Sequence, residues 1–177
     1  MTERTAESIR EQAESLARRF GTRDPIRIAR ALGIHILKVD SLKQLKGFYR
    51  VIKRNRFIFL NAKNSPRLNR IVCGHELGHD LLHREFAEEN VMDKFSVCDS
   101  SSRREYEANL FLAELLLQDG QMLERIESGM DVGAIARDTE SDVSLVALKC
   151  ESMIRRGYDL VPQGYDAAFL KGAKKRP

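Results

Sequence analysis

The chain has 177 residues, three cysteines and a formal net charge of +4. This length predicts a single domain over residues 1–156, followed by an extended or disordered tail over residues 157–177. No apolar run approaches the ~18 residues of a membrane span. The charged start without an apolar signal segment and the odd number of cysteines predict a cytoplasmic protein.

Two helices are predicted before the first strand. The apolar residues that recur at helical spacing in the first of them are Ile9, Ala13, Leu16, Ala17 and Phe20. This stripe predicts a helix that ends at Gly21, because glycine commonly follows the last helical residue. The segment Pro25–Leu32 predicts a second, shorter helix that is closed by Gly33.

A small sheet is predicted next. Ile34–Val39 has the composition of a strand, and Phe48–Lys53 and Arg56–Leu60 are expected to pair as a hairpin across Arg54-Asn55. These elements, with the helices around them, predict an α+β fold with a small antiparallel sheet. We expect Arg56–Asn61 to be an exposed edge to which an extended peptide segment could add as a further strand.

The pentad His75-Glu76-Leu77-Gly78-His79 falls in a helix predicted over Pro66–His83, with Ser65 as its cap. Residues four apart share one helix face, so the two imidazoles can converge on a single zinc ion. Glu76 lies about 100° around the helix from His75, which suits a general base acting on the attacking water. Gly78 costs about 1 kcal/mol in mid-helix, so we expect another element to approach closely there.

The pentad needs a third ligand, and its own helix does not supply one. Leu82 and Glu85 stand where a metzincin has its glycine and its last histidine, which excludes that class. His83 lies about 12 Å along the axis from His75, too far to share one metal. We therefore expect His83 at the helix end or beside a ligand, and a glutamate on a later helix as the third ligand.

Cys73 could be a rival ligand or a redox-active group, but we favour a buried thiol that packs as an apolar side chain.

The segment Glu105–Phe111 offers that glutamate. Glu105 and Asn109 share one helix face, so Glu105 could bind zinc while Asn109 orients an imidazole. Glu107 is the competing ligand. The apolar run Phe111–Leu117 predicts a buried helix, and a buried acid needs a partner.

The rest of the chain is predicted to be mainly helical. Residues 84–102 are polar and are expected to form a loop over or beside the site, long enough to act as a lid. The predicted helices are 103–118, 120–127, 132–137 and 143–156.

Basic residues gather before the pentad and at the end of the chain. They are Lys43, Lys46, Arg50, Lys53, Arg54, Arg56, Lys63, Arg67 and Arg70, then Lys171, Lys174, Lys175 and Arg176. Few aromatics and no recognisable nucleic-acid module favour a solvated face, or a dock for an acidic protein, over direct nucleic-acid binding.

The combined motifs resemble the ImmA/IrrE family of metallopeptidases, which is gluzincin-like. The residues that carry the resemblance are the pentad, Leu81-Leu82-His83, Glu105-Tyr106-Glu107-Ala108-Asn109-Leu110-Phe111 and Glu114-Leu115-Leu116-Leu117. The similarity covers roughly residues 25–120, and the helical stretch to about 156 also looks similar. The chain departs from the family pattern at Leu112 and at Gln118-Asp119, neither of which is a ligand position.

The resemblance implies a zincin-like fold with one Zn²⁺ held by His75, His79 and Glu105, and with Glu76 as the catalytic residue. It favours Glu105 over Glu107 because a thermolysin-type glutamate ligand precedes an acidic or amide residue by four. The implied activity is site-specific cleavage of a transcriptional repressor, which derepresses genes of a phage or mobile element. The alternative is a metal-containing regulatory or binding module with little proteolysis, but such a site would not need Glu76.

Overall fold

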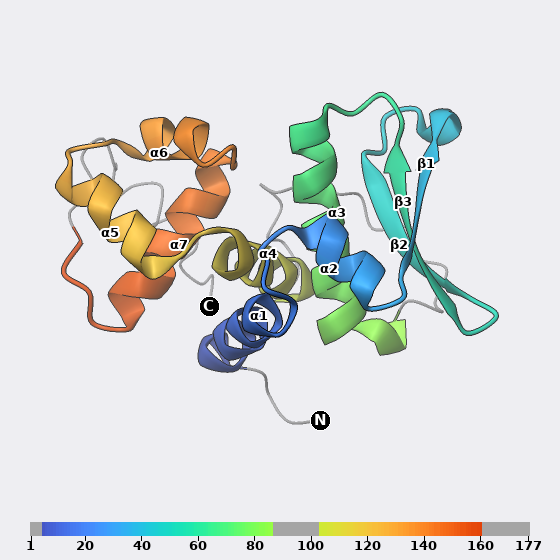
Figure 1. Cartoon of the computed structure of the whole chain (residues 1–177), viewed down its shortest axis with the longest axis horizontal. Coiled ribbons are helices and arrows are strands. Elements are labelled where there is room, and N and C mark those ends of the chain that lie inside the picture. Colours follow the sequence, from blue (N-terminus) through green and yellow to red (C-terminus); the bar gives the residue numbers. More distant parts are fainter. Residues whose placement is uncertain (1–4, 87–102, 161–177) are drawn as a thin grey trace, which may run out of the picture. The chain divides into compact units, whose positions relative to one another are not determined.

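The structure is a computed structural model that describes residues 5–86 and 103–160 (Figure 1). The chain divides into two compact units, Met1–Leu116 and Leu117–Pro177. This division falls inside the region predicted as one domain, and the single-domain interpretation stays a prediction. Residues 161–177 of the predicted tail and 87–102 of the predicted loop lie outside the described residues. Among the described helices, none has the length and apolarity needed to cross a bilayer.

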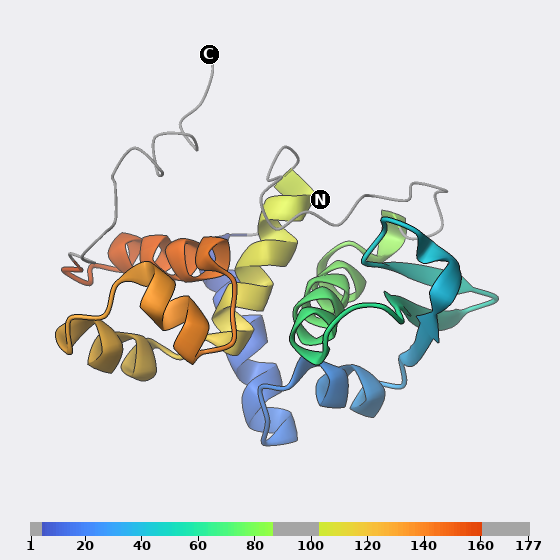
Figure 2. The ribbon, with the colours of Figure 1, turned by 90° about the horizontal axis from the view of Figure 1, so that it is seen from above.

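The first unit is a succession of packed layers. Its elements are α1 (Ala6–Phe20), α2 (Pro25–Ala31), β1 (His35–Val39), the 3₁₀ turn η1 (Asp40–Leu42), β2 (Gly47–Ile52), β3 (Asn55–Asn61), α3 (Pro66–Leu82), the 3₁₀ turn η2 (Arg84–Phe86) and α4 (Arg103–Leu116). The sheet packs on α3, α3 packs on α4, and α4 packs on α1 (Figure 2). The α+β class is thereby confirmed.

The caps of the first two helices follow from local sequence. The Thr5 hydroxyl accepts a hydrogen bond from the Ser8 amide at the start of α1, and Gly21 ends that helix with a φ of 61°. Asp24 caps α2 in the same way, with Pro25 in the first turn. Both helices were predicted because capping and glycine stop signals act within a few residues.

The sheet has the strand order β1-β3-β2 and is mixed. β2 and β3 pair antiparallel as a hairpin, whereas β1 pairs parallel to β3. The prediction of a purely antiparallel sheet is therefore wrong for one pair. The prediction that Arg56–Asn61 is an edge is also wrong, because this segment is the central strand. Its local sequence could not show that β1 would pair on its second side.

The hairpin turn lies one residue earlier than predicted. Lys53 and Arg54 occupy its two central positions, with φ of 47° and 65°, and Asn55 is already the first residue of β3. Two consecutive residues with positive φ match a two-residue hairpin turn of type I′. Asn55 supports the turn instead of forming it, since its side-chain amide donates to the Lys53 carbonyl at 3.2 Å.

One face of the sheet packs on α3. Ile58 and Leu60 point to this face and are 0% and 1% exposed. Gly47 permits close approach, since a Cβ there would lie 2.5 Å from Cγ1 of Val72. The opposite face carries the stacked rings of Phe48 and Phe59, with centroids 4.6 Å apart. Helix α3 therefore covers this face of the sheet.

The second unit is helical among its described residues. It contains α5 (Asp119–Glu127), α6 (Val132–Asp138) and α7 (Val143–Arg155), and α6 packs against α7. Asp119 at the start of α5 pairs with Lys149 Nζ at 2.6 Å and with Arg156 Nη1 at 2.5 Å. This ion cluster ties the first helix of the unit to the last.

Candidate metal centre

The pentad occupies the C-terminal half of α3. Ser65 caps the helix by accepting from the Leu68 amide at 3.2 Å, with Pro66 in the first turn. The helix ends at Leu82, and His83 follows as the C-terminal cap, its amide donating to the His79 carbonyl at 2.9 Å. The predicted helix was therefore correct to within one residue at its end.

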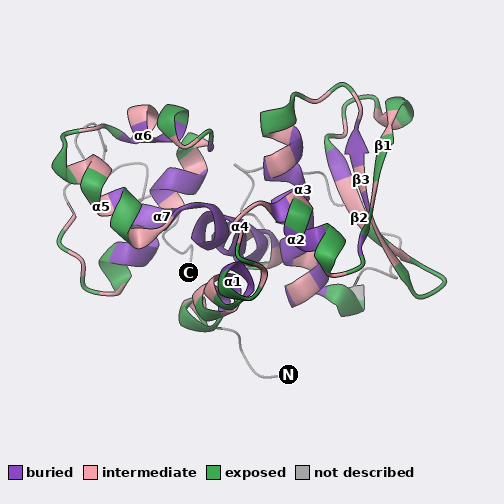
Figure 3. Cartoon of the chain, viewed as in Figure 1, coloured by how far each residue is buried: buried purple, intermediate pink, exposed green. Residues whose placement is uncertain are grey.

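Helix α4 passes close to the pentad. A Cβ built on Gly78 would lie 3.1 Å from the Ala108 Cα and 3.2 Å from the Ala108 carbonyl oxygen, which is tighter than most Cβ contacts, so a larger residue would require the Ala108 backbone to shift. The close approach expected at Gly78 is confirmed. Helix α4 is buried along nearly its whole length (Figure 3). Glu105, one turn before Ala108, is thereby brought to the histidines.

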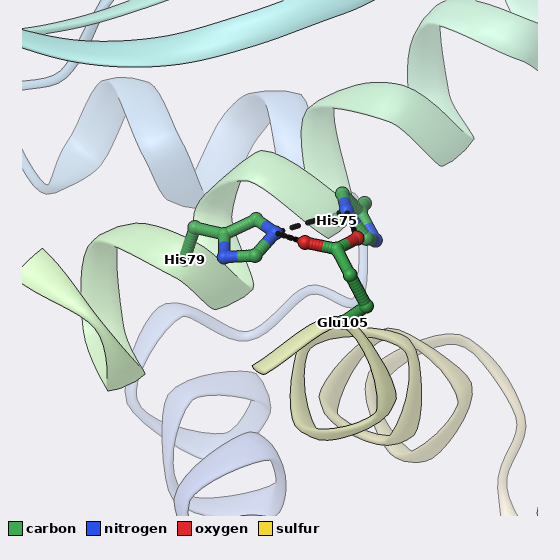
Figure 4. Close-up of side chains that lie close together, drawn as sticks. All are labelled: His75, His79 and Glu105. Carbon is green, nitrogen blue, oxygen red and sulfur yellow. Dashed lines mark hydrogen bonds and ion pairs between the residues drawn. The ribbon is translucent and has the colours of Figure 1, made fainter. Parts of the chain in front are cut away.

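Three side chains converge where the helices meet (Figure 4). The Nε2 atoms of His75 and His79 are 3.0 Å apart. Glu105 Oε2 lies 3.1 Å from the first and Oε1 lies 3.2 Å from the second. Within residues 5–86 and 103–160, this is the group of donor atoms that could hold a metal ion. Ligands at ~2.0–2.1 Å around a tetrahedral ion stand about 3.3 Å apart, so the spacing fits zinc.

The proton positions around the cluster also fit a cation. The His75 Nδ1 atom lies 2.8 Å from Oδ1 of Asn109. With that amide oxygen as acceptor, Nδ1 carries the proton and Nε2 presents a lone pair to the cluster. Burial raises the pKa of Glu105, but hydrogen bonding and charge from both histidines outweigh it and hold that pKa well below its usual range. Those hydrogen bonds are donated by Nε2 protons, and a metal ion would take the place of these protons. In the neutral ring with its proton on Nδ1, the Nε2 lone pair and the Glu105 carboxylate then face one point, which is the donor chemistry of a zinc site.

Glu107, the competing ligand, points elsewhere. Its Oε2 atom lies 2.9 Å from His83 Nε2, and its Oε1 atom accepts from Arg103 Nε at 2.7 Å. Neither Glu107 nor His83 belongs to the three-residue cluster. The structure therefore brings Glu105, not Glu107, to the paired histidines, and it places His83 at the helix end as expected.

Glu76 and Cys73 lie on the same helix, outside the donor cluster. Glu76 is buried, and its place beside the histidine face suits a base better than a ligand; its catalytic role stays a prediction. Burial, followed by the nearby Glu76 charge, raises the pKa of the Cys73 thiol far above its usual range. Such a thiol stays protonated, so Cys73 behaves as the buried apolar residue that was favoured.

Sequence reasoning missed the anchor that holds α3 to the sheet. Asp80 is 1% exposed and accepts from the Tyr49 hydroxyl at 2.6 Å, from Arg56 Nη1 at 2.9 Å and from Arg84 Nη2 at 3.2 Å. Arg56 had been grouped with the basic surface stretch, and this grouping is wrong because it serves a buried carboxylate. The signal was an acid directly after His79 on a helix face that must be buried.

Comparison with known proteins gives consistent matches. The family model described as Peptidase_M78, IrrE N-terminal-like domain, matches residues 29–151. "Uncharacterized immunity region protein 2" of Bacillus phage phi105 is 33% identical over 115 residues, covering 63% of this chain and 69% of that protein. "Metallopeptidase ImmA" of Bacillus subtilis strain 168 is 28% identical over 122 residues, covering 69% and 70% of the two chains.

Proposed function

Since the chain belongs to the metallopeptidase family Peptidase_M78, with its IrrE N-terminal-like domain, we propose that it is a zinc endopeptidase that cleaves a DNA-binding repressor. The observation that carries the proposal is the convergence of His75, His79 and Glu105, whose donor atoms stand 3.0–3.2 Å apart. Two imidazoles and one carboxylate form the usual ligand set of a catalytic His₂Glu zinc site.

His75, His79 and Glu105 would hold the metal, and Asn109 would keep His75 turned towards it. Bound zinc supplies a Lewis acid and lowers the pKa of a coordinated water to ~7. The three side chains come from two helices whose separation is fixed at Gly78 and Ala108. Their geometry is therefore set by the packed core and not by a loop, which keeps a site rigid.

Glu76 is the proposed general base. It takes a proton from the water that attacks the peptide carbonyl carbon, and it then delivers a proton to the leaving amine as the C–N bond breaks. Glu76 follows His75 on α3, is buried, and is not one of the three donor residues, which supports this role. General acid–base catalysis of this kind contributes about 10²–10⁴-fold to the rate.

The proposed substrate follows from the family and from one relative. The phage phi105 relative is named as a protein of an immunity region, and the family resemblance implies cleavage of a transcriptional repressor. We propose that this chain acts in the cytoplasm on a repressor encoded near it, and that cleavage derepresses the genes of a phage or mobile element.

A metal-containing binding module with little proteolysis is the second candidate. A structural zinc site fills all four positions with protein ligands, whereas a catalytic site leaves one for water or substrate. Within the described ranges, the donor cluster has three members. Glu76, beside that cluster, has a task only in the enzyme, so the first candidate is favoured.

Metal analysis of purified variants tests the ligand assignment. Wild-type protein is expected to contain about one zinc ion per chain, and the variants expected to lose it are His75→Ala, His79→Ala and Glu105→Ala. Glu107→Ala is the matched control from the same helix, and it should weaken zinc binding without abolishing it. Full zinc in Glu105→Ala together with none in Glu107→Ala would show that the ligand was misassigned by two positions.

A further inference from the structure

His79 has a second ring nitrogen that faces away from the donor cluster. Its Nδ1 atom lies 3.3 Å from Nδ1 of His83. The other ring nitrogen of His83, Nε2, lies 2.9 Å from Glu107 Oε2. The second oxygen of that carboxylate, Oε1, accepts a hydrogen bond from Arg103 Nε at 2.7 Å. A continuous row of polar contacts thus runs from Arg103 to the candidate ligand His79.

The carboxylate at the end of this row fixes where the protons sit. Arg103 Nε donates to Glu107 Oε1 at 2.7 Å, and this permanently charged guanidinium keeps Glu107 as a carboxylate. A carboxylate only accepts, so His83 Nε2 must carry a proton and donate it. In the neutral imidazole, His83 Nδ1 is then an acceptor, and the proton between the two rings belongs to His79 Nδ1.

This proton assignment leaves the His79 Nε2 atom with a lone pair directed at the donor cluster. The arrangement is enclosed, because His83 and Glu107 are 5% and 7% exposed, and water has little access to replace either partner. Buried polar groups are retained when each has a partner. Glu107 accepts from Arg103 on one side and from His83 on the other, and with a neutral His83 the remaining contact is donated by His79.

We infer that His83 and Glu107 are positioning residues that hold His79 as the tautomer whose Nε2 atom binds the metal. The inference rests on the proposed function, since it assumes that His79 is a ligand. Asn109 does the same for His75 through an amide oxygen at 2.8 Å. The two ligands are therefore oriented by different means, and His79 depends on a residue just past the end of its own helix. Partners of metal-ligating histidines typically contribute 10–100-fold to metal affinity.

Nitrogen NMR of the histidine rings reads the tautomers directly. The chain has only four histidines, so a long-range ¹H–¹⁵N spectrum of the zinc-loaded protein can be assigned with single substitutions. The expected result is His75 and His79 protonated at Nδ1, with His83 protonated at Nε2 alone. A proton on Nδ1 of His83 would overturn the inference, because that atom could then not accept from His79.

Metal affinity gives the second readout, measured by competition with a chelator on folded protein. His83→Ala should weaken zinc binding 10–100-fold. His83→Asn should recover most of the loss, because the asparagine oxygen takes the place of the Nδ1 acceptor. Leu82→Ala is the matched control: it truncates a fully buried neighbour and should lower stability without weakening the folded protein's affinity.

These variants distinguish failure of the proposed zinc site from failure of the positioning role of His83. If wild-type protein binds no zinc, the proposed function fails. If wild type binds zinc and His83→Ala binds it equally well, the proposed function stands and the positioning role is refuted. Equal losses of affinity in Leu82→Ala and His83→Ala would also refute it, because a general loosening of the helix end would then explain both.

Discussion

Glu105 and Glu107 are chemically identical and lie two residues apart on one helix, yet their neighbours give them different tasks. Glu105 faces two imidazole nitrogens that are 3.0 Å apart, whereas Glu107 is held between His83 and Arg103. A permanent cation beside Glu107 competes with any metal for that carboxylate. The contacts of Glu105 within the donor cluster are to imidazoles, which bind metal as readily as they donate hydrogen bonds.

The ion pair between Asp119 and Lys149 is expected to stabilise the second unit. Lys149 is fully buried and its ammonium lies 2.6 Å from Asp119 Oδ1. Asp119→Ala removes this carboxylate and should lower the free energy of unfolding by about 3 kcal/mol, as expected when one partner of a buried pair is lost. Asp138→Ala is the control, because its pair with Arg125 is exposed and should contribute less than about 1 kcal/mol.

The pH dependence of that difference has a definite sign. Although burial raises it, hydrogen bonds from Arg156 and Lys149 hold the pKa of Asp119 well below its ordinary 3.8. A depressed folded-state pKa gives stability that is complete above the unfolded value and is lost as pH falls through the folded one. Urea unfolding followed by circular dichroism should therefore show a gap between wild type and Asp119→Ala that is constant near pH 7 and shrinks below about pH 4. A gap that grows in acid would contradict this account.

At the scale of elements, the contact between α3 and α4 sets the distance between the histidines and Glu105. Gly78→Ala places a methyl 3.1–3.3 Å from three atoms of Ala108, two of them backbone. The helix-propensity gain of about 1 kcal/mol should be outweighed by overpacking of about 1–3 kcal/mol. We expect lower stability and weaker zinc binding, measured by denaturant unfolding and chelator competition.

Gly120→Ala is the matched control for that substitution. Gly120 lies in the first turn of α5, and a Cβ there meets nothing within 4 Å. It should leave stability unchanged or raise it by up to about 1 kcal/mol. If both variants gained stability, the close approach of the two helices would not be tight enough to matter.

The described helices could be predicted from sequence because their signals are local. Each predicted helix boundary in the described ranges lies within a few residues of the observed one, as at Gly21 and Ser65, where capping is visible in the sequence. The strand order of the sheet could not be predicted in the same way. The parallel partner of β3 is a strand some twenty residues earlier, and neither composition nor turn signals encode which side of a hairpin such a strand will join.

At the site, too, features encoded by local sequence could be predicted, whereas features set by packing between distant elements could not. His75, Glu76 and His79 were recognisable because one helix turn contains their spacing. The sequence left Glu105 and Glu107 open until the family resemblance was considered, since packing of α4 decides which carboxylate meets the histidines. The Arg56 contact with Asp80 was missed for the same reason.

At the scale of the whole molecule, recognition of a protein substrate must extend beyond the three donor residues. Lys53 and Arg54 are exposed at the hairpin turn and remain in the basic stretch after Arg56 is removed from it. Reversing both to glutamate should slow cleavage of the repressor far more than cleavage of a short peptide spanning its scissile bond. The difference should fall at 1 M salt, where the Debye length is only ~3 Å. Lys63→Glu, exposed but away from the turn, is the control, and equal loss on both substrates would refute a docking role.

The central claim is that Glu76 and a bound zinc ion together hydrolyse a peptide bond in a repressor. The most direct measurement compares wild type and Glu76→Gln, each with its zinc content determined, for cleavage of the proposed repressor substrate. We expect wild type to cut the repressor at one bond. Glu76→Gln should keep about one zinc ion while losing at least 10²-fold in rate. Cleavage by Glu76→Gln at the wild-type rate, or no cleavage by zinc-loaded wild type, would contradict the account.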